Sequence, residues 1–439
     1  MFTWLIQHSP LFYFTQSLWR DEAFSILVAE KPLGFFLKGI GFEPPLYYLL
    51  LHYWIKIFGE SEIATRSLSL LAFLLATWIV GVWAEKLFKK SWLAWFLPLF
   101  FFLNPMLLYY AFEIRTYGWF IFFTVASLYT YCEKNWPWYV AATVLGFYNH
   151  TYLIFVPLVQ FIHWIVTKFR GKFKKVFADP FVRSLIVIGL CMSPWLIKFL
   201  LNLSLLRQSW YFPADWQLVT AVLGNMFLGY EGTPWYLWQW TKWLSLILLG
   251  FSCLALLRPQ TRPRNLFFFL LVFVPLALVI GISFKKPLFV NRYLIFVTVA
   301  EVFLMVFALE AIKNRFLQIL TATACLLPIV CFNFWYPPQH AKLDIRATLT
   351  QINILKGPQD LIYADSPLIF FETVYYSRNR TQVFLYNPAG STFPWYVGDI
   401  IFAPHQMVRE LPVYPRRAFM VHENGNFEMV YQASKPQKL

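Results

Sequence analysis

The sequence predicts an all-α polytopic membrane protein with a small α/β domain outside the membrane at its C-terminal end. Hydrophobic residues make up 59% of the 439 residues and charged residues only 13%, too few charges for a soluble surface. Apolar runs of about 20 residues, each able to cross a bilayer core of roughly 30 Å as a helix, recur as far as residue 334. The runs are continuous and do not alternate with polar residues, which favours helices over a β-barrel.

About eleven spans are expected, since runs of this length recur along the chain. The first covers residues 2–18 and is marginal, because Ser9, Pro10 and other polar residues interrupt it. Either this first helix is tilted and broken, or the natural chain starts further upstream. The remaining spans are predicted at residues 63–83, 92–108, 117–131, 137–148, 152–167, 183–202, 236–257, 265–284, 293–310 and 316–334.

Lys and Arg residues gather in alternate loops, which the positive-inside rule places in the cytoplasm. The most basic of these loops is 168-KFRGKFKK-175. Such loops and their contact with anionic lipid account for the net charge of +15, and no basic-aromatic nucleic-acid module accompanies it. The opposite, extracytoplasmic side then holds residues 19–62, 109–116, 149–151, 203–235, 285–292 and everything after about 335.

The sequence after the last span differs in kind, so we divide the chain into a transmembrane domain, 1–335, and a soluble domain, 336–439. We expect the second domain to be a cap or a docking surface for an acceptor, because it carries no glycine-rich phosphate loop and no metal-ligand spacing. Its predicted elements are a strand near 361–364, a helix near 367–377, a strand near 382–386 and a hairpin of 418–423 with 427–432 around 424-NGN-426.

Two carboxylates, Asp21 and Glu22, follow the first apolar segment directly in 17-SLWRDEAFS-25. A carboxylate at the membrane interface has protein on one side and water on the other. That setting suits a general base, whose pKa must lie nearer the working pH than that of a free carboxylate. The alternative is an ordinary solvated helix end, since interfacial charges are common.

Two further side chains on this side are candidate metal ligands. Glu43 precedes two prolines in 41-GFEPPLYYLL-50, which holds it in an extended conformation where its oxygens could bind a divalent cation. It could equally be a helix N-terminal acid favoured by the macrodipole. His150, in 148-YNHTY-152, could be a metal ligand, an acid–base group or a structural histidine.

Arg115 and Arg292 are predicted on the extracytoplasmic side, where the positive-inside rule does not explain cations, so an anionic partner is expected there. Glu113 and Arg115 lie two residues apart in 109-YYAFEIRTYGW-119, so only an irregular turn could bring both into one cavity. Arg115 suits phosphate through its forked donors, although a local ion pair that closes the loop is the alternative. Arg292 lies in 284-FKKPLFVNRYLIF-296, against the positive-inside trend, and a lipid phosphate is its natural partner.

The order of these motifs resembles the membrane glycosyltransferases of the GT-C fold. It is most similar to bacterial relatives of protein O-mannosyltransferases and of the transferases that add aminoarabinose to lipid A. The motifs are Trp-Arg-Asp-Glu-Ala, then Pro-Pro-Leu-Tyr-Tyr followed by Phe-Gly-Glu-Ser-Glu, then Glu-Ile-Arg-Thr-Tyr and Asn-Arg-Tyr. The resemblance covers nearly the whole chain.

The resemblance implies an enzyme of the inner (plasma) membrane whose active site is extracytoplasmic. It would move a sugar from a polyprenyl monophosphate to a hydroxyl of a lipid, glycan or protein, in one displacement with inversion. Asp21 would be the general base, Glu22 would shape the site and Glu113 would assist or orient the acceptor. Fixed cations stabilise a leaving group that gains charge, so the phosphate would be held by Arg115, Arg292 and Tyr293.

One departure and two alternatives remain. Many relatives carry His or Glu-Lys before the proline pair, whereas Glu43 directly precedes Pro44 here, which leaves a divalent metal cation at Glu43 and His150 an open expectation. A transporter or flippase of lipid-linked sugars would explain the spans and the outer cations, but it needs polar sites near the bilayer midplane, and few occur in the predicted spans. A polymerase or ligase with a diphosphate-linked donor is the other alternative.

Overall fold

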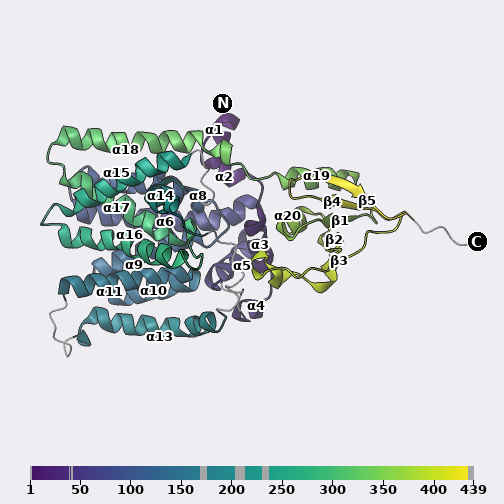
Figure 1. Ribbon diagram of the computed structural model, residues 1–439, viewed down its shortest axis with the longest axis horizontal. Helices are drawn as coiled ribbons and strands as arrows, with labels where there is room; N and C mark the ends of the chain where they lie inside the picture. Colours follow the sequence, from purple (N-terminus) through teal and green to yellow (C-terminus); the bar gives the residue numbers. More distant parts are fainter. Residues whose placement is uncertain are drawn as a thin grey trace, which may run out of the picture.

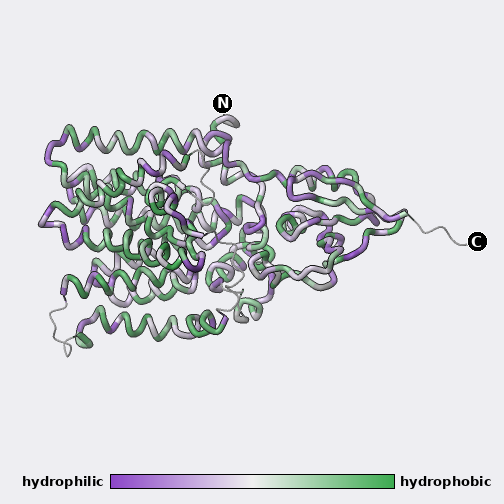
Figure 2. Tube along the Cα trace, in the orientation of Figure 1, coloured by the Kyte–Doolittle hydropathy of each residue, from purple (hydrophilic) through white to green (hydrophobic). Residues whose placement is uncertain are grey.

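The computed structural model describes residues 2–38, 40, 43–168, 176–202, 213–229 and 237–433. A bundle of long helices occupies one end of the molecule and a small sheet-containing domain the other (Figure 1). Between them lie the short helices α3 (Arg20–Ala29), α4 (Leu33–Lys38) and α5 (Leu46–Phe58). The bundle helices are largely hydrophobic along their length, and hydrophilic segments gather at loops, at the junction and in the smaller domain (Figure 2). The predicted fold class, a polytopic helical membrane protein with a C-terminal α/β domain, is confirmed.

A helix occupies each of the span positions predicted after residue 62. The bundle helices are α6 (Glu62–Phe88), α7 (Leu93–Leu103), α8 (Pro105–Ala111), α9 (Tyr117–Cys132), α10 (Trp136–Asn149), α11 (Phe155–Lys168), α13 (Pro180–Leu201), α14 (Trp216–Leu228), α15 (Trp238–Leu256), α16 (Arg262–Ser283), α17 (Ile295–Ala311) and α18 (Arg315–Trp335).

Fewer helices than expected are long enough to cross a membrane by themselves. In the described ranges seven pass on length and composition, or eight if α7 and α8, bent by 58°, form one span. The remaining three predicted spans do not pass this test, for two reasons. The helices α9 and α10 have only 16 and 14 residues. The first apolar segment folds as two short helices, α1 (Phe2–Gln7) and α2 (Leu11–Thr15), which are separated at the predicted polar break.

Helix α14 lies inside a stretch that was predicted as loop. Asp215 caps it by accepting a hydrogen bond from the Leu218 backbone N–H at 2.7 Å. A capping Asp before an apolar periodic run is a helix-start signal, so the sequence could have revealed this element.

The bend between α7 and α8 comes from Asn104 and Pro105. The Asn104 side chain caps α8 by accepting from the Leu107 N–H at 3.1 Å, and its amide donates to the Phe227 carbonyl at 3.1 Å. Proline at the first helical position costs no hydrogen bond, because that N–H would have no partner in the helix. The bend leads α8 into the short loop that carries Glu113 and Arg115.

Helix α17 lies at the centre of the bundle and packs against α15, α16, α7 and α9. Its residues are buried from Ile295 to Leu309. One of them is a carboxylic acid, Glu301, whose two oxygens have no hydrogen-bond partner among the described residues.

The C-terminal domain is a five-stranded sheet of order β3-β2-β1-β4-β5. Neighbouring strands run parallel except β4 and β5, which form the predicted hairpin with Val421 opposite Phe427. The two-residue strand β3 was not predicted. The elements are α19 (Ile345–Leu355), β1 (Leu361–Ala364), α20 (Pro367–Tyr376), β2 (Val383–Tyr386), β3 (Met407–Val408), β4 (Ala418–Val421) and β5 (Phe427–Val430).

This domain is docked against the bundle through both apolar and charged contacts. A single hydrophobic cluster combines residues of the sheet with those of α3 (Arg20–Ala29) and α5 (Leu46–Phe58). Within the interface, Arg346 pairs with Glu62 at 2.6 Å, and Arg380 pairs with Glu30 at 2.8 Å and with Glu60 at 3.1 Å. The docking therefore fixes the position of this domain relative to α3.

Candidate active site

The acidic pair Asp21 and Glu22 occupies the first turn of α3. Trp19 is extended and precedes the helix, and its backbone N–H donates to Glu22 Oε2 at 3.4 Å. Free N–H groups and the helix dipole favour negative charge at this position. The local sequence therefore starts the helix and places both carboxylates at its positive end.

Glu22 is the centre of a fully buried network. Arg66 donates from Nε to Oε1 at 2.9 Å and from Nη2 to Oε2 at 2.7 Å. Lys342 Nζ and the Ile114 backbone N–H add bonds of 3.0 Å and 3.2 Å. Burial alone would raise the pKa of Glu22, but Arg66 and Lys342 outweigh it and lower this pKa to about 2. Glu22 is therefore an anion whose oxygens are both engaged by the protein.

Arg66 fixes the chain that leads into α3. Besides Glu22, it donates to the backbone carbonyls of Phe14, Gln16 and Ser17 at 3.2, 2.6 and 3.3 Å. Sequence reasoning missed this residue, although it is the one charged side chain within the predicted span 63–83. Ionisable residues in apolar runs are rare and have a purpose, so that signal was available.

Lys342, in the connection between α18 and α19, joins two of the acids. Its Nζ lies 3.0 Å from Glu22 Oε2 and 3.5 Å from Glu113 Oε1, and also 5.5 Å from the centre of the Trp19 ring. It too was missed, because one lysine in a polar connection has no distinguishing pattern. The smaller domain thus begins with a residue that belongs to the site.

Glu113 is buried in the loop between α8 and α9, and its Oε2 has no hydrogen-bond partner among the described residues. Burial raises the pKa of this carboxyl, Lys342 opposes the rise, and the nearby Glu22 adds to it, so that the net direction is upward. Glu113 therefore offers one buried oxygen that a bound molecule could use.

Asp21 is held among three cations. Arg20 donates from Nε at 3.0 Å, and Arg292 Nη2 lies 3.7 Å from Oδ2. Burial alone would raise the pKa of Asp21, but the charges of Arg20, Arg115 and Arg292 outweigh it and hold this pKa well below its usual range. The structure therefore differs from the prediction of a pKa nearer the working pH, because these cations converge on Asp21 from three separate segments.

Arg115 pairs with Glu43 and not with Glu113. Its Nη2 lies 2.7 Å from Glu43 Oε1, and the Tyr48 hydroxyl donates to the other Glu43 oxygen. Arg115 Nη1 also donates to the Tyr48 hydroxyl at 3.3 Å. The structure thus does not have the local Glu113–Arg115 ion pair that was the alternative. Arg115 of 109-YYAFEIRTYGW-119 instead contacts Glu43 of 41-GFEPPLYYLL-50.

Arg292 and Tyr293 lie in a 3-10 turn, η4 (Asn291–Leu294), directly before α17. The Arg292 guanidinium lies 5.8 Å from the Trp19 ring and 5.9 Å from the rings of both Tyr117 and Tyr293. The Tyr293 ring is 5.2 Å from that of His150. His150 of 148-YNHTY-152 and Arg292 and Tyr293 of 284-FKKPLFVNRYLIF-296 therefore join the same cluster.

His150 is an uncharged member of this cluster. Its ring stacks on Phe120 at 4.4 Å, and Nδ1 accepts from the Tyr152 N–H at 3.3 Å. Burial, with the charges of Arg115 and Arg292, lowers the pKa of His150 to about 3. It thus takes no proton at physiological pH.

The predicted metal ligands do not fit a dedicated metal site. Across the described ranges, no group of three or more His, Cys, Asp and Glu side chains could hold a metal ion. Glu43 is already engaged by Arg115 and Tyr48, and His150 lies among aromatic rings.

The cluster holds one more cation than carboxylates, counting described side chains. Its charged members are Arg20, Arg66, Arg115, Arg292 and Lys342 on one side, and Asp21, Glu22, Glu43 and Glu113 on the other. Arg66, Arg115 and Arg292 are buried together with Asp21, Glu22 and Glu113, so the extra positive charge lies in the partly exposed part of the cluster, where it attracts an anion. The arrangement is therefore suited to a phosphate beside a carboxylate.

Two solved structures share this fold across nearly the whole chain. The crystal structure of ArnT from Cupriavidus metallidurans in the apo state matches with a TM-score of 0.64 and 13% identity, covering 96% of this chain and 91% of that one. The structure of the same protein bound to undecaprenyl phosphate matches with a TM-score of 0.62, 14% identity and the same 96% and 91% coverage. No family model matches the sequence, and no curated protein matches it. The fold predicted from the motif order is thereby confirmed.

Proposed function

We propose that the protein is an integral membrane glycosyltransferase that moves a sugar from a polyprenyl monophosphate to an acceptor hydroxyl. The observation that carries the proposal is the buried cluster in which Asp21 adjoins Arg292 and Arg115. The likeness to the ArnT structure bound to undecaprenyl phosphate supports a lipid phosphate as the anion. The acceptor is a lipid, glycan or protein, and the sugar is a hexose or pentose.

The reaction is a single displacement at the anomeric carbon. Asp21 accepts the proton of the acceptor hydroxyl as its oxygen forms a bond to that carbon from the face opposite the phosphate. The bond between the anomeric carbon and the phosphate oxygen breaks, and polyprenyl phosphate leaves with the electron pair. Arg292 and Arg115 stabilise the negative charge that the phosphate gains, and Tyr293 completes this side of the site.

Donor binding would also make Asp21 a better base. Arg292 lies 3.7 Å from Asp21 and helps hold its pKa down. A phosphate that draws Arg292 toward itself weakens that effect, so the pKa of Asp21 rises toward the working pH. The base is thus activated when the leaving group is in place.

The other acids have supporting roles in this proposal. Glu22 is a positioning residue, because both of its oxygens are engaged by Arg66, Lys342 and the protein backbone. Glu113 orients the acceptor hydroxyl through its free Oε2, and Lys342 opposes the rise in the pKa of that carboxyl.

We place the site and the C-terminal domain on the extracytoplasmic side of the inner membrane. The start of α6 contacts Arg346 of that domain, whereas its other end lies roughly 40 Å away, 27 residues on. At that far end, Arg258 and Arg264 pair with Glu310 at 3.1 and 2.6 Å, so basic residues gather opposite the site. By the positive-inside rule this end is cytoplasmic.

Cysteine labelling tests the orientation. In a variant without the natural cysteines, Ser391→Cys and Arg258→Cys each introduce a thiol at an exposed position. An impermeant maleimide added to intact spheroplasts should label the first and leave the second unlabelled until the membrane is opened. The reverse pattern would overturn the orientation and the extracytoplasmic site with it.

Transfer itself is tested with purified protein, a radiolabelled polyprenyl-monophosphate sugar and a membrane extract as acceptor. Asp21→Asn should reduce transfer by at least about 10²-fold, in the range typical for loss of a general base. Asp179→Asn is the matched control, because Asn replaces Asp well at the N-terminal cap of α13. Absence of transfer by the wild-type protein, or full activity of Asp21→Asn, would contradict the proposal.

One observation favours the transporter alternative. Glu301 is a buried carboxylic acid in the middle of α17, and acids within membrane helices commonly mark transport pathways. If that function holds, vesicles should translocate a fluorescent lipid-linked sugar without any transfer. Translocation should then be lost in Glu301→Gln and retained in Asp21→Asn.

A further inference from the structure

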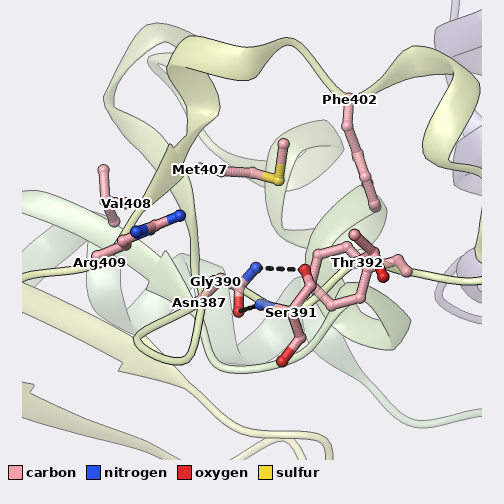
Figure 3. A pocket seen from close by; sticks show the side chains of 9 residues that line it. Asn387, Gly390, Ser391, Thr392, Phe402, Met407, Val408 and Arg409 are labelled. Atoms are coloured by element: carbon pink, nitrogen blue, oxygen red, sulfur yellow. Dashed lines mark hydrogen bonds between the residues drawn. The ribbon is translucent and has the colours of Figure 1, made fainter.

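A pocket in the C-terminal domain lies outside the cluster around Asp21. It has a volume of about 470 Å³, and its lining includes Asn387, Ser391, Phe402 and Arg409 (Figure 3). Asn387 directly follows β2, and Arg409 directly follows β3. Ligands of sheets with parallel strands bind beyond the carboxyl ends of the strands, which is where this pocket is.

The rim of the pocket is rigid. The Asn387 amide accepts from the Ser391 N–H at 3.0 Å and donates to the Ser391 carbonyl at 2.8 Å, and both bonds are drawn in Figure 3. Gly390 has a φ of +62°, and a Cβ at this position would lie 2.7 Å from Arg409 Nη2. Glycine therefore lets the guanidinium of Arg409 lie directly against the loop.

The polar groups of the pocket are unused by the protein. Among the described residues, neither the Arg409 guanidinium nor the hydroxyls of Ser391 and Thr392 have a hydrogen-bond or ion-pair partner. The opposite wall is apolar and includes Phe393 and Phe402, whose ring centres are 6.0 Å apart. A ligand that matches this lining has an apolar face, several hydroxyls and one anionic group.

A row of packed aromatic rings connects the pocket to the helix that carries the proposed base. Phe402 stacks on Phe371 at 5.2 Å, and Phe371 contacts Phe24 at 5.4 Å. Phe24 lies three residues after Asp21 on α3, hence on the same side of that helix. The loop between the two pocket phenylalanines also packs here, since a Cβ on Gly398 would lie 2.9 Å from both Phe24 and Phe371.

We propose that this pocket binds an anionic sugar unit of the acceptor, a pyranose that carries a carboxylate or a phosphate. Arg409 takes the anionic group, the two hydroxyls bind sugar hydroxyls, and the phenylalanines cover the apolar face of the ring. The inference rests on the proposed transferase function, because it assigns the pocket to the acceptor of that reaction. A uronate of a polysaccharide and a phosphorylated sugar of a glycolipid are the two sources of this chemistry.

Binding to full-length protein in lipid nanodiscs tests the pocket without any turnover. Isothermal titration calorimetry would compare a galacturonic acid tetrasaccharide, its neutral methyl ester and glucose 6-phosphate. The acidic tetrasaccharide should bind best if the source is a uronate, and glucose 6-phosphate if it is a phosphate. Loss of a charge-assisted contact weakens binding by about tenfold or more, so Arg409→Gln should do so for the preferred probe.

The control is Arg416→Gln, which removes an equally exposed charge at the amino end of β4, where Arg416 donates to the Gln359 carbonyl at 3.1 Å. This variant should bind as the wild-type protein does. Absence of binding for both anionic probes, or equal binding by Arg409→Gln and wild type, would overturn the pocket assignment.

The two proposals fail separately. Asp21→Asn should keep the affinity for the probe while losing transfer. Binding that depends on Arg409 without any transfer by wild type would reject the transferase alone. Transfer without such binding would reject only the pocket. In the active enzyme, Arg409→Gln should raise the acceptor KM and leave kcat unchanged, as expected for uniform binding.

Discussion

Replacement of Arg66 by Met should unfold the site more readily than any other single change in the cluster. Arg66 is fully buried and bonds both oxygens of Glu22 together with three backbone carbonyls. Without it, the buried Glu22 carboxylate keeps only Lys342 and two backbone N–H groups. Removing one partner of a buried ion pair costs about 3–5 kcal/mol, and carbonyls left without partners place the change at the upper end, about 5 kcal/mol.

A double-mutant cycle isolates the pair. Glu22→Leu removes the charge that Arg66→Met leaves behind. The double variant should therefore lose about 2–3 kcal/mol less unfolding free energy than the two single variants lose in sum. Unfolding would be followed by intrinsic fluorescence of the 20 tryptophans at fixed detergent composition. Arg183→Met is the control, since Arg183 is exposed and donates only to the Phe177 carbonyl at 3.0 Å, and it should cost under about 0.5 kcal/mol.

Two results would refute this reasoning. The loss of about 5 kcal/mol requires that Glu22 stays ionised, so a loss below about 1 kcal/mol would show that the pair is not what holds α3. Strict additivity in the cycle would show that Glu22 and Arg66 are not coupled.

Three further outcomes follow from the other groups. Lys342→Met should raise the pKa of Glu113 further, because it removes the cation that opposes the rise, and should move the acid limb of the pH–rate profile upward. Lys342→Arg should restore the limb, and an unshifted limb would remove Glu113 from the reaction. Burial raises the pKa of Glu372 from 4.5 to about 8. Between these two pH values the native protein holds one proton more than the unfolded chain, so its stability falls as the pH rises through this range. Glu372→Gln should therefore melt at a higher temperature than wild type at pH 8.5 and at the same temperature at pH 5, and identical pH dependence would contradict the shift. Chelator treatment should leave transfer within about twofold, since the described residues offer no metal site, and loss that one divalent cation restores would show otherwise.

The side of the molecule on which the site lies could be predicted, whereas the pairing within the site could not. The basic loops and the order of the motifs predicted that Asp21, Arg115 and Arg292 lie at one end of the molecule. This was possible because the charge of a loop is a property of a whole segment of sequence. The partner of Arg115 is Glu43, 72 positions away, and only the fold decides which of two nearby acids an arginine reaches.

The direction of a pKa is still harder to predict from sequence. That of Asp21 is set by charges from three segments, Arg20 beside it, Arg115 before α9 and Arg292 before α17. The same limit applies to short elements. Strand β3 has only two residues, too few for any periodic pattern, while α14 carried a recognisable cap at Asp215.

The place of Lys342 in the chain has a consequence for how the protein is made. Synthesis proceeds from the N-terminus, so Asp21, Glu22 and Glu113 are all made before this lysine, which follows α18, the last helix of the bundle. Until then Glu22 and Glu113 lack a cation that touches both of them in the finished protein. A nascent chain would therefore hold an incomplete site until its final segment is synthesised, and a chain that stops after the bundle would never complete it.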